Sequence, residues 1–189
     1  MAYTTLAELK AYLGIPTAET GDDALLTSII TRAQALIEAY TNRVFEAATV
    51  TKYFHTEDVE GQILRLWSDD LLTVTTLTNG DGTVIAAANF RLEPRNNTPK
   101  WAIRLDENYS WEFTDGDSEI TVAGTWGWST TAPGNIVHAC VRLAAFIYRQ
   151  KDTNADIDRP LVTGDGVTIM PTALPSDVTR ILDLYRRRI

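Results

Sequence analysis

The residue types that most often carry chemistry are scarce and scattered in this sequence. His55 and His138 are the only histidines, and Cys140 is the only cysteine. His138 and Cys140 are two positions apart on an expected helix, so they point to different sides of it, and no second cysteine can complete a thiolate site. We therefore predict no metal site, and interpret the pair as a partly buried histidine and a small core cysteine.

Carboxylates gather at residues 115–119, as they do in calcium-binding loops. The sequence there is Asp115-Gly116-Asp117-Ser118-Glu119. It lacks the spacing of an EF-hand loop, and no helix is expected on either side, so a solvated turn between strands is favoured. A hydrolase that uses this cluster, with Asp117→Asn as its test, stays open as a third hypothesis.

Two motifs of catalytic proteins are incomplete or absent. Residues 163–166, Thr-Gly-Asp-Gly, lack the lysine and the strand–helix context of a phosphate loop. The sequence contains no Gly-x-Ser-x-Gly nucleophile elbow. We therefore predict that the protein is not an enzyme, and that it has neither catalytic residues nor a cofactor.

Four tryptophans lie in one stretch of the chain, at Trp101, Trp111, Trp126 and Trp128. On an exposed sheet face such rings can stack on sugars, whereas on a buried face they fill a small core. Trp101 alternates with Ile103 and Leu105, which favours the core. A carbohydrate-binding or other surface-binding β-module of a phage or bacterial protein is the alternative hypothesis.

Four helices are expected around this stretch. Thr5 and Glu8 have capping-box spacing at the start of the first helix, and Gly14 can end it. Asp22 or Asp23 can cap the second helix. The third begins after Pro133-Gly134 and the fourth at Pro175. The apolar positions recur at helical spacing: Leu26, Ile29, Ile30, Ala33, Ile37 and Tyr40, then Ile136, Val137, Cys140, Leu143, Ala144, Ile147 and Tyr148, then Val178, Ile181, Leu182 and Tyr185.

The width of these helical stripes is informative about assembly. The stripes at 26–40 and 136–148 are broader than one narrow face. We interpret them as too broad for one small subunit to cover alone, so neighbouring copies or a partner must complete their burial. An Ile37→Asp substitution is then expected to disrupt folding or assembly, because it buries an unpaired charge.

Between the second and third helices the pattern is that of β-strands, from about residue 50 to residue 126. β-branched and aromatic residues alternate there with polar ones, and residues 79–82, Asn-Gly-Asp-Gly, make a strong turn. Tyr109, Trp111 and Phe113 are expected on one strand face. We predict an α+β fold: a helical bundle of about four helices at 1–48 and 130–189, with an inserted small antiparallel β-sheet or barrel of about six strands at 49–129.

Composition and charge limit the partners of the protein. The 189 residues are 44% hydrophobic and 22% charged, with a net charge of −8. Such an acidic surface repels phosphate at long range. The sequence shows neither a signal peptide nor the roughly 20 apolar residues of a membrane span. We expect a soluble protein that is made in a cytoplasm and does not bind a membrane.

The helical segments resemble the head–tail connector proteins of tailed phages, the adaptor or head completion family. The resemblance begins with Leu13-Gly14-Ile15 and Asp22-Asp23, is closest over residues 33–43, and includes residues 133–149 and the terminal Leu184-Tyr185-Arg186. Further positions that carry it are Leu26, Ile29, Ile30, Ala33, Ile37, Glu38, Tyr40, Arg43 and Phe45. These are packing patterns, and they cover about half of the chain.

The resemblance implies a structural virion protein of the phage neck. It implies a larger member of the family that carries a β insertion, assembled in the host cytoplasm into a homo-oligomeric ring beneath the portal. Portal protein, a downstream neck or tail protein, and double-stranded DNA passing through without sequence readout would be its partners. The basic end of the chain suits either a helix dipole or docking onto an acidic partner or phosphate. Candidate subunit or portal interface residues are Leu26, Ile30, Ile37, Tyr40, Tyr185, Arg186, Arg187 and Arg188.

Overall fold

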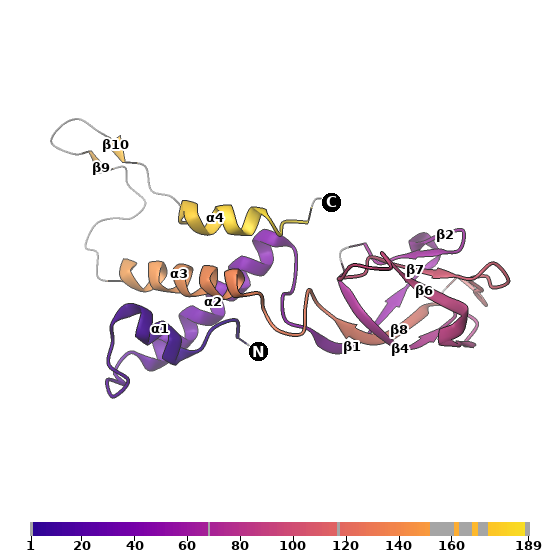
Figure 1. Cartoon of the computed structure of the whole chain (residues 1–189), viewed down its shortest axis with the longest axis horizontal. Coiled ribbons are helices and arrows are strands. Elements are labelled where there is room, and N and C mark those ends of the chain that lie inside the picture. The colour runs from indigo at the N-terminus through magenta and orange to yellow at the C-terminus, as the bar shows by residue number, and fades with distance from the viewer. Residues whose placement is uncertain are drawn as a thin grey trace. The chain divides into compact units, whose positions relative to one another are not determined.

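The computed structural model describes residues 2–67, 69–116, 118–151, 161–162, 168–169 and 174–187. The chain forms two compact units (Figure 1). The helical unit comprises residues 1–41 and 133–186, and the β unit comprises residues 42–132 and 187–189. Because each unit has its own hydrophobic core, we describe them separately.

Helix α1 (Leu6–Leu13) has the boundaries that its local sequence predicts. The backbone N–H of Glu8 donates to Thr5 Oγ1 at 3.2 Å, and the backbone N–H of Thr5 donates to Glu8 Oε2 at 2.8 Å. This reciprocal pair is the expected capping box. Gly14 follows the helix with φ 75°, a left-handed conformation that glycine adopts without steric strain, so both predicted ends of α1 are confirmed.

The other helices are α2 (Asp23–Thr41), α3 (Gly134–Gln150) and α4 (Ser176–Asp183). The two acids at the start of α2 are bound to side chains of other segments. Asp22 accepts hydrogen bonds from the Tyr148 hydroxyl at 2.6 Å and from Lys151 Nζ at 2.9 Å. Asp23 pairs with the buried Lys10 at 2.7 Å. Both carboxylates therefore join parts of the helical unit that are distant in the sequence.

One chain covers most of the apolar stripes of its own helices. Helix α3 packs against α1, α2 and α4, and α2 also contacts α4. Helices α1 and α4 therefore cover most of the stripes on α2 and α3 within one chain, while Leu36 stays 45% exposed, and cover by a neighbouring copy stays a prediction. The buried apolar residues of the predicted stripes are Leu26, Ile29, Ile30, Ala33 and Ile37 on α2, Ile136, Cys140, Leu143 and Ala144 on α3, and Val178 and Leu182 on α4.

The β unit contains two four-stranded antiparallel sheets, eight strands where about six were expected. The first sheet has the order β1-β8-β4-β5 and the second has the order β2-β3-β7-β6. Two 3-10 turns, Thr56–Asp58 and Ala87–Asn89, connect strands. The strands are β1 (Ala48–Phe54), β2 (Val59–Glu60), β3 (Ile63–Arg65), β4 (Leu71–Thr78), β5 (Val84–Ile85), β6 (Phe90–Glu93), β7 (Ala102–Leu105) and β8 (Ile120–Trp126).

One apolar cluster holds the two sheets of the β unit together. It takes side chains from both sheets, including Phe54, Leu64, Leu77, Ile103 and Val122. The turn expected at residues 79–82 lies where predicted, between β4 and β5. The prediction of a strand through Tyr109, Trp111 and Phe113 is wrong. Of these three residues only Phe113 forms a β-bridge, and its partner is Gly80.

Outside the two four-stranded sheets, β9 (Leu161–Val162) and β10 (Thr168–Ile169) pair with each other over two residues. Among the described residues, no helix has the length and apolar character needed to cross a bilayer.

The four helices and the antiparallel sheets confirm the predicted α+β class. The description of residues 49–129 as an inserted domain stays a prediction.

Candidate interaction surfaces

Three of the predicted interface residues lie inside the helical unit. Leu26 and Ile37 are 0% exposed, and Ile30 is 4% exposed. Their side chains leave no surface for a neighbouring subunit to cover. They are core residues that hold α2 against the other helices of its unit.

Three other predicted residues meet at the C-terminal end of α4. The Tyr40 hydroxyl donates to Asp183 at 2.7 Å, and this hydrogen bond to a carboxylate raises the pKa of Tyr40. The Tyr185 hydroxyl donates to Asn135 at 2.8 Å, and the Arg186 guanidinium lies 5.5 Å from the centre of the Tyr40 ring. We call the surface formed by Tyr40, Leu184, Tyr185 and Arg186 the α4 corner.

The α4 corner presents both an apolar and a cationic group to solvent. Leu184 is 78% exposed, the largest exposed fraction among the large hydrophobic residues of the described chain. Arg186 beside it is also exposed. An exposed leucine next to an arginine and two tyrosines has the composition of protein interface centres, where aromatic residues and arginine are enriched.

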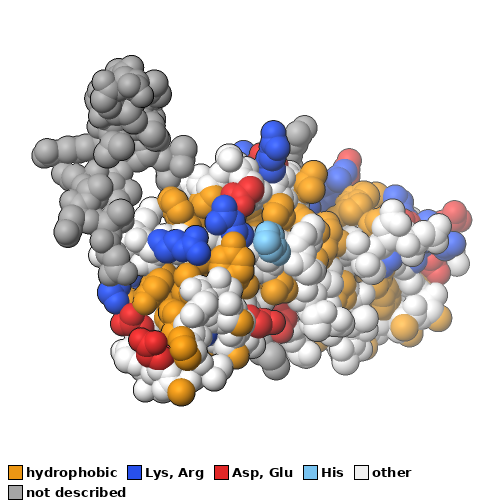
Figure 2. All heavy atoms as spheres, turned by 60° about the vertical axis from the view of Figure 1, so that its left-hand side comes forward, with side chains coloured by type: hydrophobic (Ala, Val, Ile, Leu, Met, Phe, Trp, Pro, Cys, Tyr) orange, Lys and Arg blue, Asp and Glu red, His pale blue; other side chains and the backbone are white. Residues whose placement is uncertain are grey.

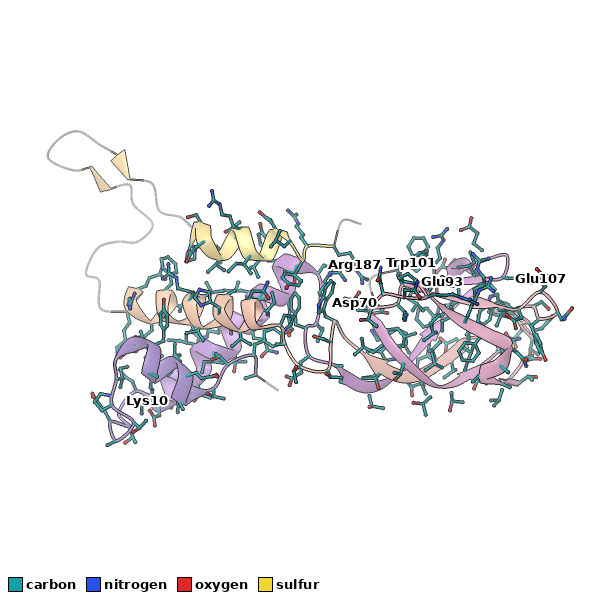
Figure 3. All side chains as sticks on the ribbon, viewed as in Figure 1. Lys10, Asp70, Glu93, Trp101, Glu107 and Arg187 are labelled. Atoms are coloured by element: carbon teal, nitrogen blue, oxygen red, sulfur yellow. The ribbon has the colours of Figure 1, made fainter. Side chains whose placement is uncertain are left out.

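Arg187 belongs to the β unit, where it binds a buried carboxylate. Asp70 accepts hydrogen bonds from both Arg43, at 2.6 and 2.7 Å, and Arg187 Nη2 (Figure 3). Arg187 Nη1 also donates to the Trp67 carbonyl at 2.6 Å. Burial lowers the pKa of Arg187, while the negative charge of Asp70 raises it. Arg188, the last predicted interface residue, lies outside the described residues.

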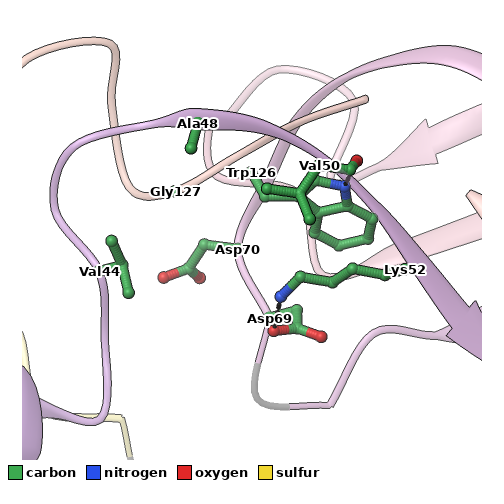
Figure 4. Close-up of a pocket in the computed structure, with 8 residues that line it drawn as sticks. All are labelled: Val44, Ala48, Val50, Lys52, Asp69, Asp70, Trp126 and Gly127. Carbon is green, nitrogen blue, oxygen red and sulfur yellow. Dashed lines mark hydrogen bonds and ion pairs between the residues drawn. The ribbon is translucent and has the colours of Figure 1, made fainter. Parts of the chain in front are cut away.

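A hollow of about 220 Å³ lies beside this cluster in the β unit (Figure 4). Its lining includes three charged groups, and each has an ion-pair partner, which for Asp70 is Arg43 and Arg187. Lys52 forms an ion pair with Asp69 and lies 4.8 Å from the centre of the Trp126 ring. The hollow therefore suits contact with an apolar side chain better than acid–base chemistry. Its lining residues are Val44, Ala48, Val50, Lys52, Asp69, Asp70, Trp126 and Gly127.

The histidines and the cysteine are not brought together. His55 is half exposed, with Nε2 3.4 Å from Glu119. His138 is exposed, so its expected partial burial is wrong. Cys140 is fully buried as expected, and burial raises the pKa of its thiol to about 12. Among residues whose placement is described, no three His, Cys, Asp or Glu side chains could hold a metal ion.

Two other sequence features lie where the structure gives no description. Asp117, the test residue of the hydrolase hypothesis, is outside the described residues, and so are residues 163–166. Asp115, at the start of the same acidic cluster, accepts a hydrogen bond from the Ser118 hydroxyl at 2.8 Å. The described part of this cluster therefore forms a local turn.

The tryptophans divide between core and surface. Trp126 and Trp111 are buried, and Trp128 packs against Phe45 with ring centres 6.2 Å apart. Trp101 is 49% exposed, so its predicted core position is wrong. Strand β7 starts one residue later, and the alternation with Ile103 and Leu105 does not extend back to Trp101.

Sequence reasoning missed Trp67, which is 62% exposed. It lies near Trp101, since the backbone N–H of Leu66 donates to the Trp101 carbonyl at 3.0 Å. Its φ is 40°, a conformation that side-chain-bearing residues seldom adopt. No sequence signal predicts such a conformation for tryptophan, so its exposure is visible only in the structure.

The face of the molecule that Figure 2 shows is not uniformly acidic. In Figure 2, basic, acidic and hydrophobic side chains are interspersed over the described part of the surface that is in view. Charges also pair across elements, as the half-buried Arg142 and the exposed Asp177 do at 2.8 Å. Mixed charge of this kind favours contact with proteins over binding to a polyanion.

Comparison with known proteins gave one family and several related folds. The family model described as head completion protein matches residues 2–188. A chain from the neck of an empty GTA (gene transfer agent) particle, computed with C6 symmetry, has a TM-score of 0.68 and 22% identity, with 97% of this chain and 90% of that chain covered. A search of the curated proteins gave no match.

Two further solved structures have the same fold. A chain from the neck of a native GTA particle, computed with C12 symmetry, has a TM-score of 0.65 and 21% identity, covering 97% of this chain and 89% of that chain. A chain from the virion of a native gene transfer agent particle has a TM-score of 0.63 and 24% identity, covering 97% and 90%.

Proposed function

Because this chain belongs to the head completion protein family, we propose that it is a structural protein of a virion neck, where it joins head to tail without catalysing a reaction. The match of the family model to residues 2–188 is the observation that carries this proposal. The fold shared with chains from GTA necks supports it. The paired carboxylates and the buried thiol of the described residues agree with a protein that does no chemistry.

In this proposal several copies form a ring beneath the portal, and double-stranded DNA passes through it. The related GTA necks were computed with C6 and C12 symmetry, which supports a repeated subunit. A net charge of −8 suits a passage that does not retain phosphate. Assembly in the host cytoplasm and contact with a downstream neck or tail protein complete the proposal.

We assign portal or subunit contact to the α4 corner and to the basic end of the chain. Leu184 and Arg186 are exposed there, whereas Leu26, Ile30 and Ile37 are buried in the core of the helical unit. In the same scheme the helical unit is the connector domain, and the β unit is a domain inserted into it. The compactness of each unit supports that division.

The proposal is tested by native mass spectrometry and cryo-microscopy of the purified chain mixed with portal protein. We expect a multi-subunit assembly bound to the portal. Arg186→Glu should weaken binding to the portal, whereas Arg32→Glu, the same charge reversal at an exposed position of α2, should leave it unchanged. A chain that stays monomeric in the presence of the portal contradicts the proposed function.

A second candidate function follows from the exposure of Trp67 and Trp101. These rings lie on adjacent segments of the β unit and are 62% and 49% exposed, as in proteins that stack aromatic rings on sugars. Tryptophan fluorescence titrated with a panel of glycans tests it. A shift that Trp101→Ala abolishes supports a carbohydrate-binding module, and no shift across the panel removes this candidate.

A further inference from the structure

Strand β1 leaves a long edge of the first sheet open. Among the described strands it pairs with β8 alone, over the seven residues Ala48–Phe54, and the Val50 carbonyl also accepts a hydrogen bond from Trp126 Nε1 at 3.1 Å. In an antiparallel edge strand, alternate residues point their N–H and C=O groups away from the partner, which makes a template for another strand. The other edge strands of the two four-stranded sheets have two residues in β2, two in β5 and four in β6.

Two common devices that protect an open edge, proline and a bulge, are absent from β1, and the one inward-pointing charge of the strand is neutralised. The strand contains neither proline nor glycine, and its register with β8 runs without a bulge from Ala48 opposite Trp126 to Phe54 opposite Ile120. Its only charged side chain, Lys52, pairs with Asp69 on the inner face of the sheet. The lysine is therefore not available to repel an approaching strand.

The outer face of the sheet beside this edge carries no charged side chain among the described residues. Thr49, Thr51 and Tyr53 are exposed on the outer face of β1. The register places uncharged residues beside them: Thr121, Ala123 and Thr125 on β8, then Thr73, Thr76 and Thr78 on β4. Copies of a chain with net charge −8 repel one another except where their contact surfaces are neutral. Because the related GTA necks were computed with C6 and C12 symmetry, a second copy of this chain is the partner that the proposed function brings to this neutral edge.

The hollow described above lies next to the same strand. Ala48 and Val50 line it, and both are exposed, Val50 by 44%. Strand addition gains affinity from main-chain hydrogen bonds and specificity from pockets for alternate side chains of the added strand. The hollow offers one such apolar pocket beside the open edge.

We propose that β1 is an assembly edge, where an extended segment of a second copy of this chain adds to the sheet by main-chain hydrogen bonds. Pairing of β1 with β1 of the other copy is a two-fold contact that closes as a dimer, whereas a ring needs two different surfaces. The added segment is therefore not β1. This inference rests on the proposed function and specifies one contact between copies.

Amide hydrogen exchange of the full chain, alone and assembled with portal protein, tests the backbone contact. We expect the fast-exchanging amides of residues 48–54 to slow by about tenfold or more on assembly. Unchanged exchange in an assembly that does form overturns this inference and leaves the proposed function standing. If the portal slows exchange of these amides in a chain that has no neighbouring copies, a second copy is not the partner of the β1 edge.

A pair of matched substitutions tests the edge independently. Thr51→Lys places a charge on the edge strand, and Thr76→Lys places the same charge on the same outer face, on β4. Melting curves should confirm that both variants fold. We expect Thr51→Lys to raise the subunit concentration needed for assembly by about tenfold or more, and Thr76→Lys to change it by less than about twofold. Equal effects contradict an edge contact, and failure of the unmodified chain to assemble contradicts the proposed function as well.

Discussion

Asp70 accepts hydrogen bonds from two guanidinium groups, those of Arg43 and Arg187, although only 7% of the residue is exposed. Arg43 also lies 4.6 Å from the centre of the Trp128 ring. One buried anion thus joins segments that are 27 and 117 positions away in the sequence. At the scale of the residue, Asp70 therefore connects segments that are distant in the sequence.

Asp70→Asn should strongly destabilise the β unit. Removing one charge from a buried ion pair costs about 3–5 kcal/mol, because the partner charge stays buried without compensation. Urea denaturation followed by tryptophan fluorescence measures the change. Glu107→Gln, the same carboxylate-to-amide change at an exposed position of the β unit, is the control and should leave stability unchanged. Equal stability of the two variants contradicts the assigned role of Asp70.

The stability of the helical unit should fall in acid. Hydrogen bonds from Tyr148 and Lys151 lower the pKa of Asp22 below its usual 3.8, and the one from Arg142 lowers the pKa of Asp177. A depressed folded-state pKa contributes stability above the unfolded value, and that stability is lost as the pH falls through the folded value. Melting temperature by circular dichroism should therefore drop below about pH 4, and the drop should be smaller in Asp22→Asn. A melting temperature independent of pH would contradict this assignment.

At the scale of the element, α2 shows how burial depends on position within a helix. Ile37 is 0% exposed, whereas the preceding Leu36 is 45% exposed. The two neighbours differ because one points into the core of the helical unit and the other away from it. Sequence hydrophobicity alone does not separate them.

Ile37→Asp should unfold the helical unit or abolish assembly, and Leu36→Asp should leave the fold intact. Burial of an unpaired carboxylate costs several kcal/mol, whereas water solvates the charge at an exposed position. Circular dichroism at 222 nm during thermal unfolding measures both variants. Equal melting temperatures for the two variants would show that the burial assigned to Ile37 is wrong.

Strand β8 depends on a glycine for its pairing with β4. A Cβ atom at Gly124 would lie 2.2 Å from the Thr73 carbonyl oxygen, closer than such atoms can approach. Gly124→Ala should therefore force the strands apart and cost about 1–3 kcal/mol, as overpacking does. Gly116→Ala is the control, because a Cβ there meets nothing within 4 Å. Differential scanning calorimetry should show a lower melting temperature for Gly124→Ala alone.

At the scale of the whole molecule, the chain forms two compact units, and one of them combines two segments that are separated in the sequence by the other. The helical unit takes residues from both sides of the β unit, and its helices bury most of their apolar stripes within one chain. Assembly therefore has to use surface features, such as the α4 corner and the edge of β1. The fold is complete in one chain, and the contacts between copies are a separate property.

The free chain should bind double-stranded DNA weakly. A net charge of −8 repels phosphates, so few counterions are released on contact. Fluorescence anisotropy with a labelled duplex at about 0.15 M salt should give no binding below roughly 10⁻⁴ M, weaker than typical non-specific binders. A basic DNA-binding protein of similar size is the positive control. Tight binding that weakens steeply with salt would contradict passage of DNA without retention.

The sequence by itself determined the features that local interactions control. The capping box of Thr5 and Glu8, the stop at Gly14 and the turn at 79–82 each depend on residues a few positions apart. The 3.6-residue period located α2 and α3, because an amphipathic pattern survives without knowledge of the partner. The family resemblance drew on these same helical patterns, and the match over residues 2–188 confirms it.

The tertiary structure alone decided which surfaces are covered and which distant groups meet. The exposure of Trp101, the absence of a strand through Tyr109 and the joining of Asp70 to Arg187 depend on segments far apart in the chain. The burial of the apolar stripes on α2 and α3 depends in the same way on their contacts with α1 and α4. Burial is a sum over neighbours in space, and sequence spacing reports only neighbours along one helix or strand.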